Sequence, residues 1–380
     1  MVRGKWKLKG VGFCLCLFLS LLSVLSTGKV GVLAADERIF LPLTLEFLDE
    51  YEFKDNRYND TVVGGFSGIT YNPLEDTYYI ISDDRSQYSP ARFYKAKIRI
   101  DGEKISDVIL EDVVLLKDEA GNLYPENTID AEGIAYTPRQ TLFISSEGVV
   151  DRKISPFINE YDLQGNLISK LPIASKYIPA EKGKGIQNNL GFESLAIKAN
   201  SLSPKESFRL FTATEAALSQ DLNSNNPQTN LNARFLHYLV GNNPLLIGEH
   251  LYKIAPATST TLYNGICELL ALPEEGHLLS LERTFGLGGY GAKIFQITIA
   301  NASDTTLQES LNNNDNLVPI RKKLLLDLGE LGIQLDNLEG MTLGPRLADG
   351  SQSLIVVSDN NFAPNNQQKN QFLLFRLSKS

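Results

Sequence analysis

Acidic residues recur along this chain in pairs that two antiparallel strands would bring together. The clearest copy lies between Asp130 and Gly148, where Glu132 is near the start of one apolar segment and Glu147 follows the next. Neighbouring antiparallel strands place the start of one beside the end of the other. We therefore expect these two carboxylates to lie together at one edge of a sheet.

Four further segments repeat this arrangement with a period of about 60 to 75 residues. The first column of aligned positions contains Ser67, Glu132, Glu193, Glu268 and Glu339, and the second contains Asp83, Glu147, Glu215, Glu282 and Asp359. Nine of these ten positions are acidic, whereas only 45 of the 380 residues in the chain are Asp or Glu. The repetition therefore indicates a ring of carboxylates.

Such a ring predicts a cation site. Carboxylates within roughly 4–6 Å raise one another's pKa, so they must be protonated, paired or bound to a metal. Oxygen ligands favour Ca²⁺ or Mg²⁺ over zinc, and His237, His250 and His277 do not have zinc-ligand spacing. We expect the metal ligands to be a subset of Asp83, Glu132, Glu147, Glu193, Glu215, Glu268, Glu282, Glu339 and Asp359.

Basic residues are expected on the same face of the ring. Arg92, Arg234 and Lys293 align at the start of the third segment of their repeats, and Arg85 and Arg283 follow the acidic column. These groups would stabilise negative charge on a substrate. A structural explanation also stays open, in which the acids cap turns or pair with Arg and Lys to hold the repeats together.

Other catalytic chemistries have little support in the sequence. The chain has no Gly-x-Ser-x-Gly nucleophile elbow. Ser67 stands in an acidic column, and no histidine aligns with it. Cys267 is expected to be a small buried residue on a strand.

The elements that carry these positions are predicted to be short strands. Each repeat has a third and a fourth apolar segment, and the turns are rich in Pro, Asn, Asp and Gly. Four antiparallel strands per repeat, with almost no helical periodicity, predict an all-β fold, a β-propeller of five repeats with five or six blades. Residues 41–53 would pair with the C-terminal blade and close the ring. The polar segments Ser219–Asn232 and Asp304–Asn316 are predicted to be mobile surface insertions.

The N-terminus is typical of a secretory signal peptide. Basic residues precede an apolar run from Val11 to Leu25, and small residues follow near Ala34. We expect residues 1–34 to be removed, leaving one domain, 36–380, that is exported to the periplasm or the extracellular space. The alternative is an uncleaved anchor, although the apolar run is short for a membrane span.

Removal of residues 1–34 changes the formal charge from −9 to −14, because it takes away five basic residues and no acidic one. Such a charge disfavours binding to nucleic acid or to an anionic membrane. We expect a monomer that acts on a small-molecule ester or phosphoester, with no nucleic-acid partner and no membrane attachment after cleavage.

Several motifs resemble those of the phytase-like family, whose full description is esterase-like activity of phytase. The motifs are Gly65-Phe66-Ser67-Gly68-Ile69, Tyr79-Ile80-Ile81-Ser82-Asp83-Asp84-Arg85, Asp130-Ala131-Glu132-Gly133-Ile134, Asn189-Leu190-Gly191-Phe192-Glu193-Ser194-Leu195, Leu338-Glu339-Gly340-Met341 and Val357-Ser358-Asp359-Asn360-Asn361. The match extends from about Gly64 to Arg376. The resemblance implies an exported β-propeller that hydrolyses phosphoesters or esters, with Ca²⁺ as the expected ion.

Together these observations predict a phytase-like hydrolase, a divalent-cation-dependent phosphoesterase or esterase with an acidic site at the mouth of the propeller channel. The expected catalytic residues are Glu132, Glu193, Arg85, Arg92, Arg234 and Arg283. Two alternatives stay open, a propeller that binds a ligand or partner without catalysis, and a calcium-dependent lactonase or carboxylic esterase. The sequence does not select the substrate.

Overall fold

The structure is a computed structural model that describes Met1 and residues 39–379, except 180–182, 202, 224, 226–229, 257–259, 313, 315 and 365–366. The expected signal peptide, apart from Met1, lies outside the described residues. The chain divides into two units, Met1–Pro42 and Leu43–Ser380. The second unit carries all of the strands below. In the described part of the chain no helix is both long and apolar enough to cross a membrane.

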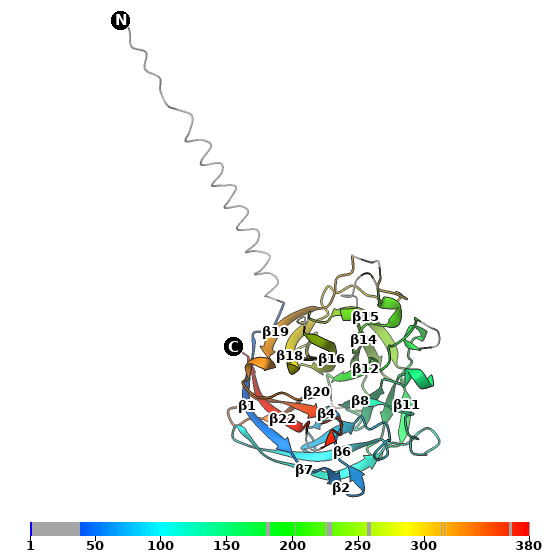
Figure 1. The fold of residues 1–380 in the computed structure, drawn as a ribbon, viewed down its shortest axis with the longest axis vertical. Helices are drawn as coiled ribbons and strands as arrows, with labels where there is room; N and C mark the ends of the chain where they lie inside the picture. Colours follow the sequence, from blue (N-terminus) through cyan, green and yellow to red (C-terminus); the bar gives the residue numbers. More distant parts are fainter. Residues whose placement is uncertain are drawn as a thin grey trace. The chain divides into compact units, whose positions relative to one another are not determined.

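Five four-stranded antiparallel sheets, the blades, surround a common centre in the unit Leu43–Ser380 (Figure 1). Blade 1 contains β4 (Phe66–Asn72), β5 (Thr77–Ser82), β6 (Arg92–Asp101) and β7 (Lys104–Leu115). Blade 2 contains β8 (Ala131–Tyr136), β9 (Leu142–Ser146), β10 (Phe157–Tyr161) and β11 (Leu167–Lys170). Blade 3 contains β12 (Phe192–Lys198), β13 (Phe208–Thr214), β14 (Asn232–Val240) and β15 (Leu245–Lys253).

Blade 4 contains β16 (Thr261–Ala271), β17 (His277–Gly286), β18 (Gly289–Thr298) and β19 (Arg321–Asp327). Blade 5 contains β20 (Asn337–Arg346), β21 (Gln352–Asp359), β22 (Asn370–Lys379) and β1 (Leu43–Phe53). A small separate hairpin pairs β2 (Arg57–Tyr58) with β3 (Thr61–Val62). The prediction of a β-propeller is confirmed, and the number of blades is five.

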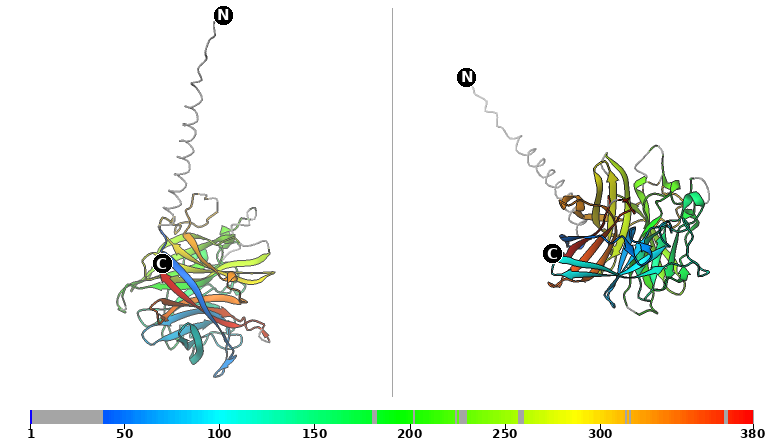
Figure 2. Two further views of the ribbon diagram at one scale, coloured as in Figure 1. Left: turned by 90° about the vertical axis from the view of Figure 1, so that its left-hand side faces the viewer. Right: turned by 60° about the horizontal axis from the view of Figure 1, so that its bottom comes forward.

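The N-terminal strand closes the ring, as predicted. β1 is antiparallel to β22, with Leu43 opposite Lys379 and Phe53 opposite Asn370. Figure 2 shows β1 in blue beside the red C-terminal strands. Because β1 covers the outer edge of β22, the backbone groups at that edge are paired rather than open to another chain.

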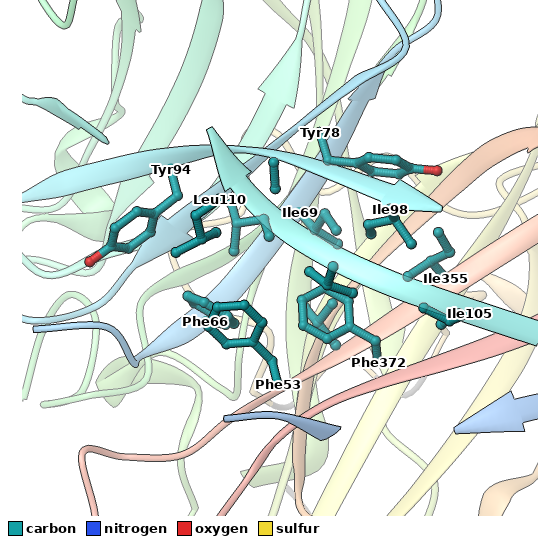
Figure 3. Packing of buried hydrophobic residues seen from close by; sticks show 14 of the residues in the cluster. Phe53, Phe66, Ile69, Tyr78, Tyr94, Ile98, Ile105, Leu110, Ile355 and Phe372 are labelled. Carbon is teal, nitrogen blue, oxygen red and sulfur yellow. The ribbon is translucent and has the colours of Figure 1, made fainter. Parts of the chain in front are cut away.

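Apolar side chains fill the spaces between neighbouring blades. In β5, Tyr78 and Ile80 pack against blade 5, whereas Tyr79 and Ile81 pack against blade 2. Figure 3 shows the first of these cores, where Phe53, Phe66 and Phe372 meet from three strands. A strand whose two faces are both buried needs a continuous apolar run, since successive side chains point to opposite faces. This requirement explains the unbroken apolar segments of the sequence.

One prediction about the loops is wrong in part. Asp221 and Thr305 lie in the two polar segments that were expected at the surface, and both are fully buried. Asp221 pairs with Arg234 at 2.7 Å, and the Thr305 hydroxyl donates to Glu249 at 3.0 Å. Burial of these polar residues is tolerated because charged or hydrogen-bonding partners lie beside them.

Candidate functional site

β-Bulges place the first column of residues. β4 pairs with β5 through Phe66 opposite Ser82 and Gly68 opposite Ile81, so Ser67 is an extra residue on its strand. The register shifts in the same way at Glu193 in β12 and at Glu339 in β20. A bulge redirects the side chain that it carries. The second column follows directly, because Asp83, Glu147 and Glu215 come immediately after strands β5, β9 and β13.

The aligned positions of blade 4 were predicted one residue out of register. Ile266 lies opposite Glu282, as Phe66 lies opposite Ser82, so the bulged residue is Cys267 rather than Glu268. The residue that matches the second column is therefore Arg283 rather than Glu282. A slip of one residue sends a side chain to the opposite face of a strand.

Glu268 and Glu282 consequently have other partners. Glu268 accepts hydrogen bonds from the backbone N–H groups of Leu195 at 3.2 Å and Leu269 at 2.9 Å. Glu282 pairs with Lys322 and accepts from the Tyr252 hydroxyl at 2.6 Å. Among the residues that the structure describes, the clusters of acids that could hold an ion include neither of these carboxylates.

The other acids of both columns come together at the centre of the ring, and Asp130 joins them. We call this set the central cluster. It consists of Asp83, Asp130, Glu132, Glu147, Glu193, Glu215, Glu339 and Asp359. Within it, one carboxylate oxygen from each of Asp130, Glu132 and Glu147 lies within 4.8 Å of the others, and the same is true of Glu147, Glu193 and Glu215. Two triads of buried acids therefore share Glu147.

Burial and mutual repulsion raise the pKa values of these acids. Desolvation is the largest cause of the raised pKa of Glu132, followed by repulsion from Asp130 and Asp83. Desolvation raises the pKa of Asp83 to about 7 and that of Glu339 to about 8. Carboxyl groups with such pKa values hold protons near neutral pH unless a cation compensates their charge.

Two arginines supply part of that compensation. Arg85 donates from Nε to Oδ1 of Asp130 at 2.6 Å, and its side chain is 31% exposed. Arg283 donates from Nη2 to Oε1 of Glu215 at 2.8 Å and from Nη1 to Glu339. Among the described residues Glu132, Glu147 and Glu193 have no ion-pair partner, so the two arginines leave both triads undercompensated.

Arg92 and Arg234 are engaged in other buried ion pairs. Arg92 pairs with Asp84, and its Nε donates to the Tyr94 hydroxyl at 2.7 Å. Arg234 contacts Asp221 and also Glu249, at 2.5 Å from Nη1 to Oε1. Both arginine side chains have no exposed surface. Their alignment at the start of the third strand is confirmed for Arg92, which lies opposite Ser82, but these two guanidinium groups face buried acids of their own.

An apolar layer lies below the acids. Each inner strand contributes one buried residue near the middle of its motif, namely Ile69, Ile134, Leu195, Leu269 and Met341. These residues border a pocket of about 300 Å³ that all five inner strands line. Glu268 links the inner strands beside this pocket, because its carboxylate accepts hydrogen bonds from backbone N–H groups of blades 3, 4 and 5. The low-dielectric layer contributes to the desolvation of the cluster.

Two members of the site were missed as site residues in the sequence. Asp130 lies two positions before Glu132, a spacing that puts both side chains on one face of an extended segment. Asn337 lies two positions before Glu339 and donates to it from Nδ2 at 2.8 Å. The corresponding positions in blades 1, 3 and 4 are Gly65, Gly191 and Gly265, so the polar side chains of Asp130 and Asn337 do not recur in the other repeats.

The donor set fits a hard divalent cation. Its atoms are carboxylate oxygens, the ligands that Ca²⁺ and Mg²⁺ prefer. Oε2 of Glu147 and Oε2 of Glu339 are buried and have no hydrogen-bond partner among the described residues. A buried acceptor without a donor is costly, and a cation would satisfy it.

Comparison with known proteins identifies the family. The family model named phytase-like, and described as esterase-like activity of phytase, matches residues 61–362. The chain belongs to the phytase-like family. The motifs around Ser67, Glu132, Glu193 and Glu339 lie within the matched region. No match to this phytase-like chain was found among curated proteins.

Solved structures that are similar to this phytase-like protein have diverse activities. One is a putative oxidoreductase (glucose dehydrogenase) from Thermus thermophilus, with 14% identity, 85% and 87% coverage of the two chains and a TM-score of 0.36. An endo-1,4-beta-xylanase from Bacteroides thetaiotaomicron has 9% identity, 82% and 90% coverage and a TM-score of 0.44. An alpha-L-arabinanase from Penicillium chrysogenum has 13% identity, 88% and 82% coverage and a TM-score of 0.40. These similarities do not indicate the activity.

Proposed function

We propose that this phytase-like protein is an exported, divalent-cation-dependent phosphoesterase whose active site is the central cluster. The observation that carries the proposal is the pair of buried carboxylate triads that share Glu147. Ion pairs with Arg85 and Arg283 compensate the negative charges of Asp130, Glu215 and Glu339. They leave the other carboxylates of the triads without compensation, and a Ca²⁺ ion would supply it.

The cation ligands would be drawn from the two triads. They are Asp130, Glu132, Glu147, Glu193 and Glu215. A bound cation would attract the phosphate group of a substrate and lower the pKa of an attacking water. Asp83 and Asp359 add negative charge beside the triads, and desolvation followed by repulsion from Asp83 raises the pKa of Asp359.

Arg85 is the proposed contact for the substrate. Its side chain is the more exposed of the two arginines that reach the cluster, at 31% compared with 10% for Arg283. A guanidinium group offers several donors to phosphoryl oxygens. Arg85 also donates to Oδ1 of Asn189, so the segments that lead into blades 2 and 3 both orient it.

Whichever of Glu132 and Glu193 does not bind the cation would accept and donate protons during the reaction. Desolvation raises the pKa of both carboxyl groups well above the ordinary range. A carboxylate with a raised pKa accepts a proton from water more readily near neutral pH. The expected substrate is a small-molecule phosphoester, and phytate is one member of that class.

The experiment is an assay of purified residues 36–380 on phytate, p-nitrophenyl phosphate, a carboxylic ester and a lactone, each with Ca²⁺ and with EDTA. We expect phosphate release that requires Ca²⁺ and returns when the metal is restored. Turnover of only the carboxylic ester or the lactone would support the alternative esterase or lactonase. Bound calcium without turnover of any substrate would favour a propeller that only binds a ligand.

A further inference from the structure

Blade 4 has a guanidinium group where the other four blades have a carboxylate. In those blades Thr214 lies opposite Phe192, Ser358 opposite Leu338, Ser82 opposite Phe66 and Ser146 opposite Ala131, and an acid directly follows the first residue of each pair. In blade 4, Glu282 lies opposite Ile266. The residue that follows Glu282 is Arg283, so its side chain occupies the position of the missing acid.

The guanidinium group of Arg283 gathers three oxygen atoms. Nη2 donates to Oε1 of Glu215 at 2.8 Å, and Nη1 donates to Oε1 of Glu339 and to Oδ1 of Asn337, the latter at 2.5 Å. Glu215 follows the second strand of blade 3, whereas Asn337 and Glu339 belong to blade 5. Arg283 therefore joins the two blades on either side of its own.

Gly265 makes space for this contact. It lies opposite Arg283 in the register of β16 and β17. A Cβ atom at this position would lie 2.5 Å from Cγ of Glu215 and 2.7 Å from Oε1 of Glu215. Its φ angle is not in the left-handed region, so the position requires glycine for space alone.

The ring of Tyr263 completes the surroundings of Arg283. The guanidinium carbon lies 5.3 Å from the centre of this ring. An aromatic face stabilises a cation that has lost part of its hydration. The position is therefore suited to a permanent positive charge.

We propose that Arg283 is a built-in cation that takes the place of a divalent ion between blades 3 and 5 and confines the exchangeable ion to the part of the cluster around Glu147. Two carboxylate oxygens and an amide oxygen that converge on one group are also the ligands that Ca²⁺ would take. The inference rests on the proposed cation binding. Because arginine stays protonated in proteins, its charge is present at any calcium concentration.

The test is to count Ca²⁺ ions per chain in residues 36–380 by equilibrium dialysis and metal analysis. Arg283→Gln is expected to bind one more Ca²⁺ ion than the wild type, because three oxygen atoms are released. Arg283→Lys keeps a positive charge and is expected to keep the wild-type count. Lys322→Met is the matched control, since Lys322 pairs with Glu282 outside the cluster, and it is expected to keep the wild-type count.

Thermal unfolding supplies a second measurement. In EDTA, Arg283→Gln is expected to melt below the wild type, because Glu215 and Glu339 lose their partner. Calcium is expected to raise the melting temperature of Arg283→Gln more than that of the wild type. Lys322→Met is expected to show no increased response to calcium.

An equal Ca²⁺ count in the wild type and Arg283→Gln overturns the inference. If neither binds Ca²⁺, the proposed function fails together with it. If the wild type binds none and Arg283→Gln binds one, Arg283 does take the place of an ion, but the cation-dependent function fails, and the confinement of an exchangeable ion around Glu147 fails with it. If Arg283→Gln cannot be purified, Glu339→Gln is the second variant. Its affinity for Ca²⁺ is expected to fall by less than about 10-fold, the lower limit for the loss of a residue that supports a metal ligand, and a greater loss overturns the inference.

Discussion

At the scale of single residues, the site depends most on Glu147. One oxygen of its carboxylate, Oε1, accepts from the backbone N–H of Gly191 at 2.5 Å, which orients the side chain. The other, Oε2, is buried and has no hydrogen-bond partner among the described residues. Because both triads include Glu147, its loss would remove a ligand from each.

Glu147→Gln is therefore predicted to lower the affinity for Ca²⁺ by at least about 100-fold and to abolish cation-dependent turnover. Loss of a residue that only supports a metal ligand lowers metal affinity by up to about 100-fold, and loss of a ligand is expected to cost at least as much. Glu268→Gln is the matched control. It makes the same chemical change at another buried glutamate, one whose contacts are backbone N–H groups. We expect it to lower the melting temperature and to retain the bound cation. Calorimetric titration and thermal unfolding check both, and equal loss of affinity in the two variants would contradict the assignment.

The raised pKa values predict an unusual dependence of stability on pH. The pKa of Asp83 is about 7 and that of Glu339 about 8 in the folded protein, compared with about 4 in the unfolded chain. The folded protein then binds more protons than the unfolded chain between these values, so stability falls as the pH rises from about 4 to about 8. Without metal, the melting temperature is predicted to decrease over this range.

Added Ca²⁺ is predicted to flatten that decrease, because it stabilises the ionised carboxylates and displaces their protons. Melting curves in EDTA and in Ca²⁺ across the pH range provide the measurement. A melting temperature in EDTA that rises steadily from about pH 4 to about pH 8 would show that the cluster is already compensated by its arginines.

At the scale of elements, the close approach of the inner strands sets the dimensions of the site. A Cβ atom on Gly133 would lie 2.4 Å from the carbonyl oxygen of Glu193 and 2.7 Å from Oγ of Ser145. Gly68 and Gly340 are similarly close to backbone atoms of the neighbouring blade. In blades 1, 2, 3 and 5 a glycine or serine follows the bulge, and these small residues let the carboxylates of adjacent blades meet.

Gly133→Ala is predicted to separate β8 from β12 and to cost about 1–3 kcal/mol of stability, as overpacking does. It should also weaken cation binding, because Glu132 and Glu193 flank the contact. Gly288→Ala is the control, since nothing lies within 4 Å of its added Cβ and its φ is not left-handed. Its free energy of unfolding is expected to change by no more than about 0.5 kcal/mol. Denaturant unfolding distinguishes the two, and an equal response would contradict the steric explanation.

At the scale of the whole propeller, β1 makes the ring continuous. The ring of Phe53, at the end of β1, lies 6.1 Å from that of Phe66 in blade 1 and 6.5 Å from that of Phe372 in blade 5. β1 therefore contributes both the outer strand of blade 5 and part of the core between the first and last blades. Residues far apart in the sequence hold the ring closed.

A chain that begins at Lys54 is predicted to lose this closure. The edge of β22 would be exposed, so we expect aggregation and a lower unfolding temperature than for residues 36–380. Size-exclusion chromatography and thermal unfolding compare the two chains. A shorter chain that remains monomeric and equally stable would show that blade 5 does not need β1.

The five repeats, the closing strand and most of the acids that meet at the centre could be predicted from the amino-acid sequence. These features were predictable because turns are local and because strands buried on both faces require continuous apolar runs. Glu132, Glu147 and Glu193 were identified in this way. The bulges at Glu132 and Glu193 occur at the same position of their repeats. Aligning the repeats therefore placed these residues correctly without knowledge of the bulges.

The register of blade 4 and the partners of the arginines could be assigned only from the three-dimensional fold. Cys267 and Glu268 lie side by side in the apolar run of β16, so the repeat can be aligned in two ways that differ by one residue. Pairing with β17 directs Arg283 to the cluster and Glu282 to Lys322. Arg234 contacts Glu249 because β14 pairs with β15. The repeat pattern of the sequence does not show which side chains of these two strands come into contact.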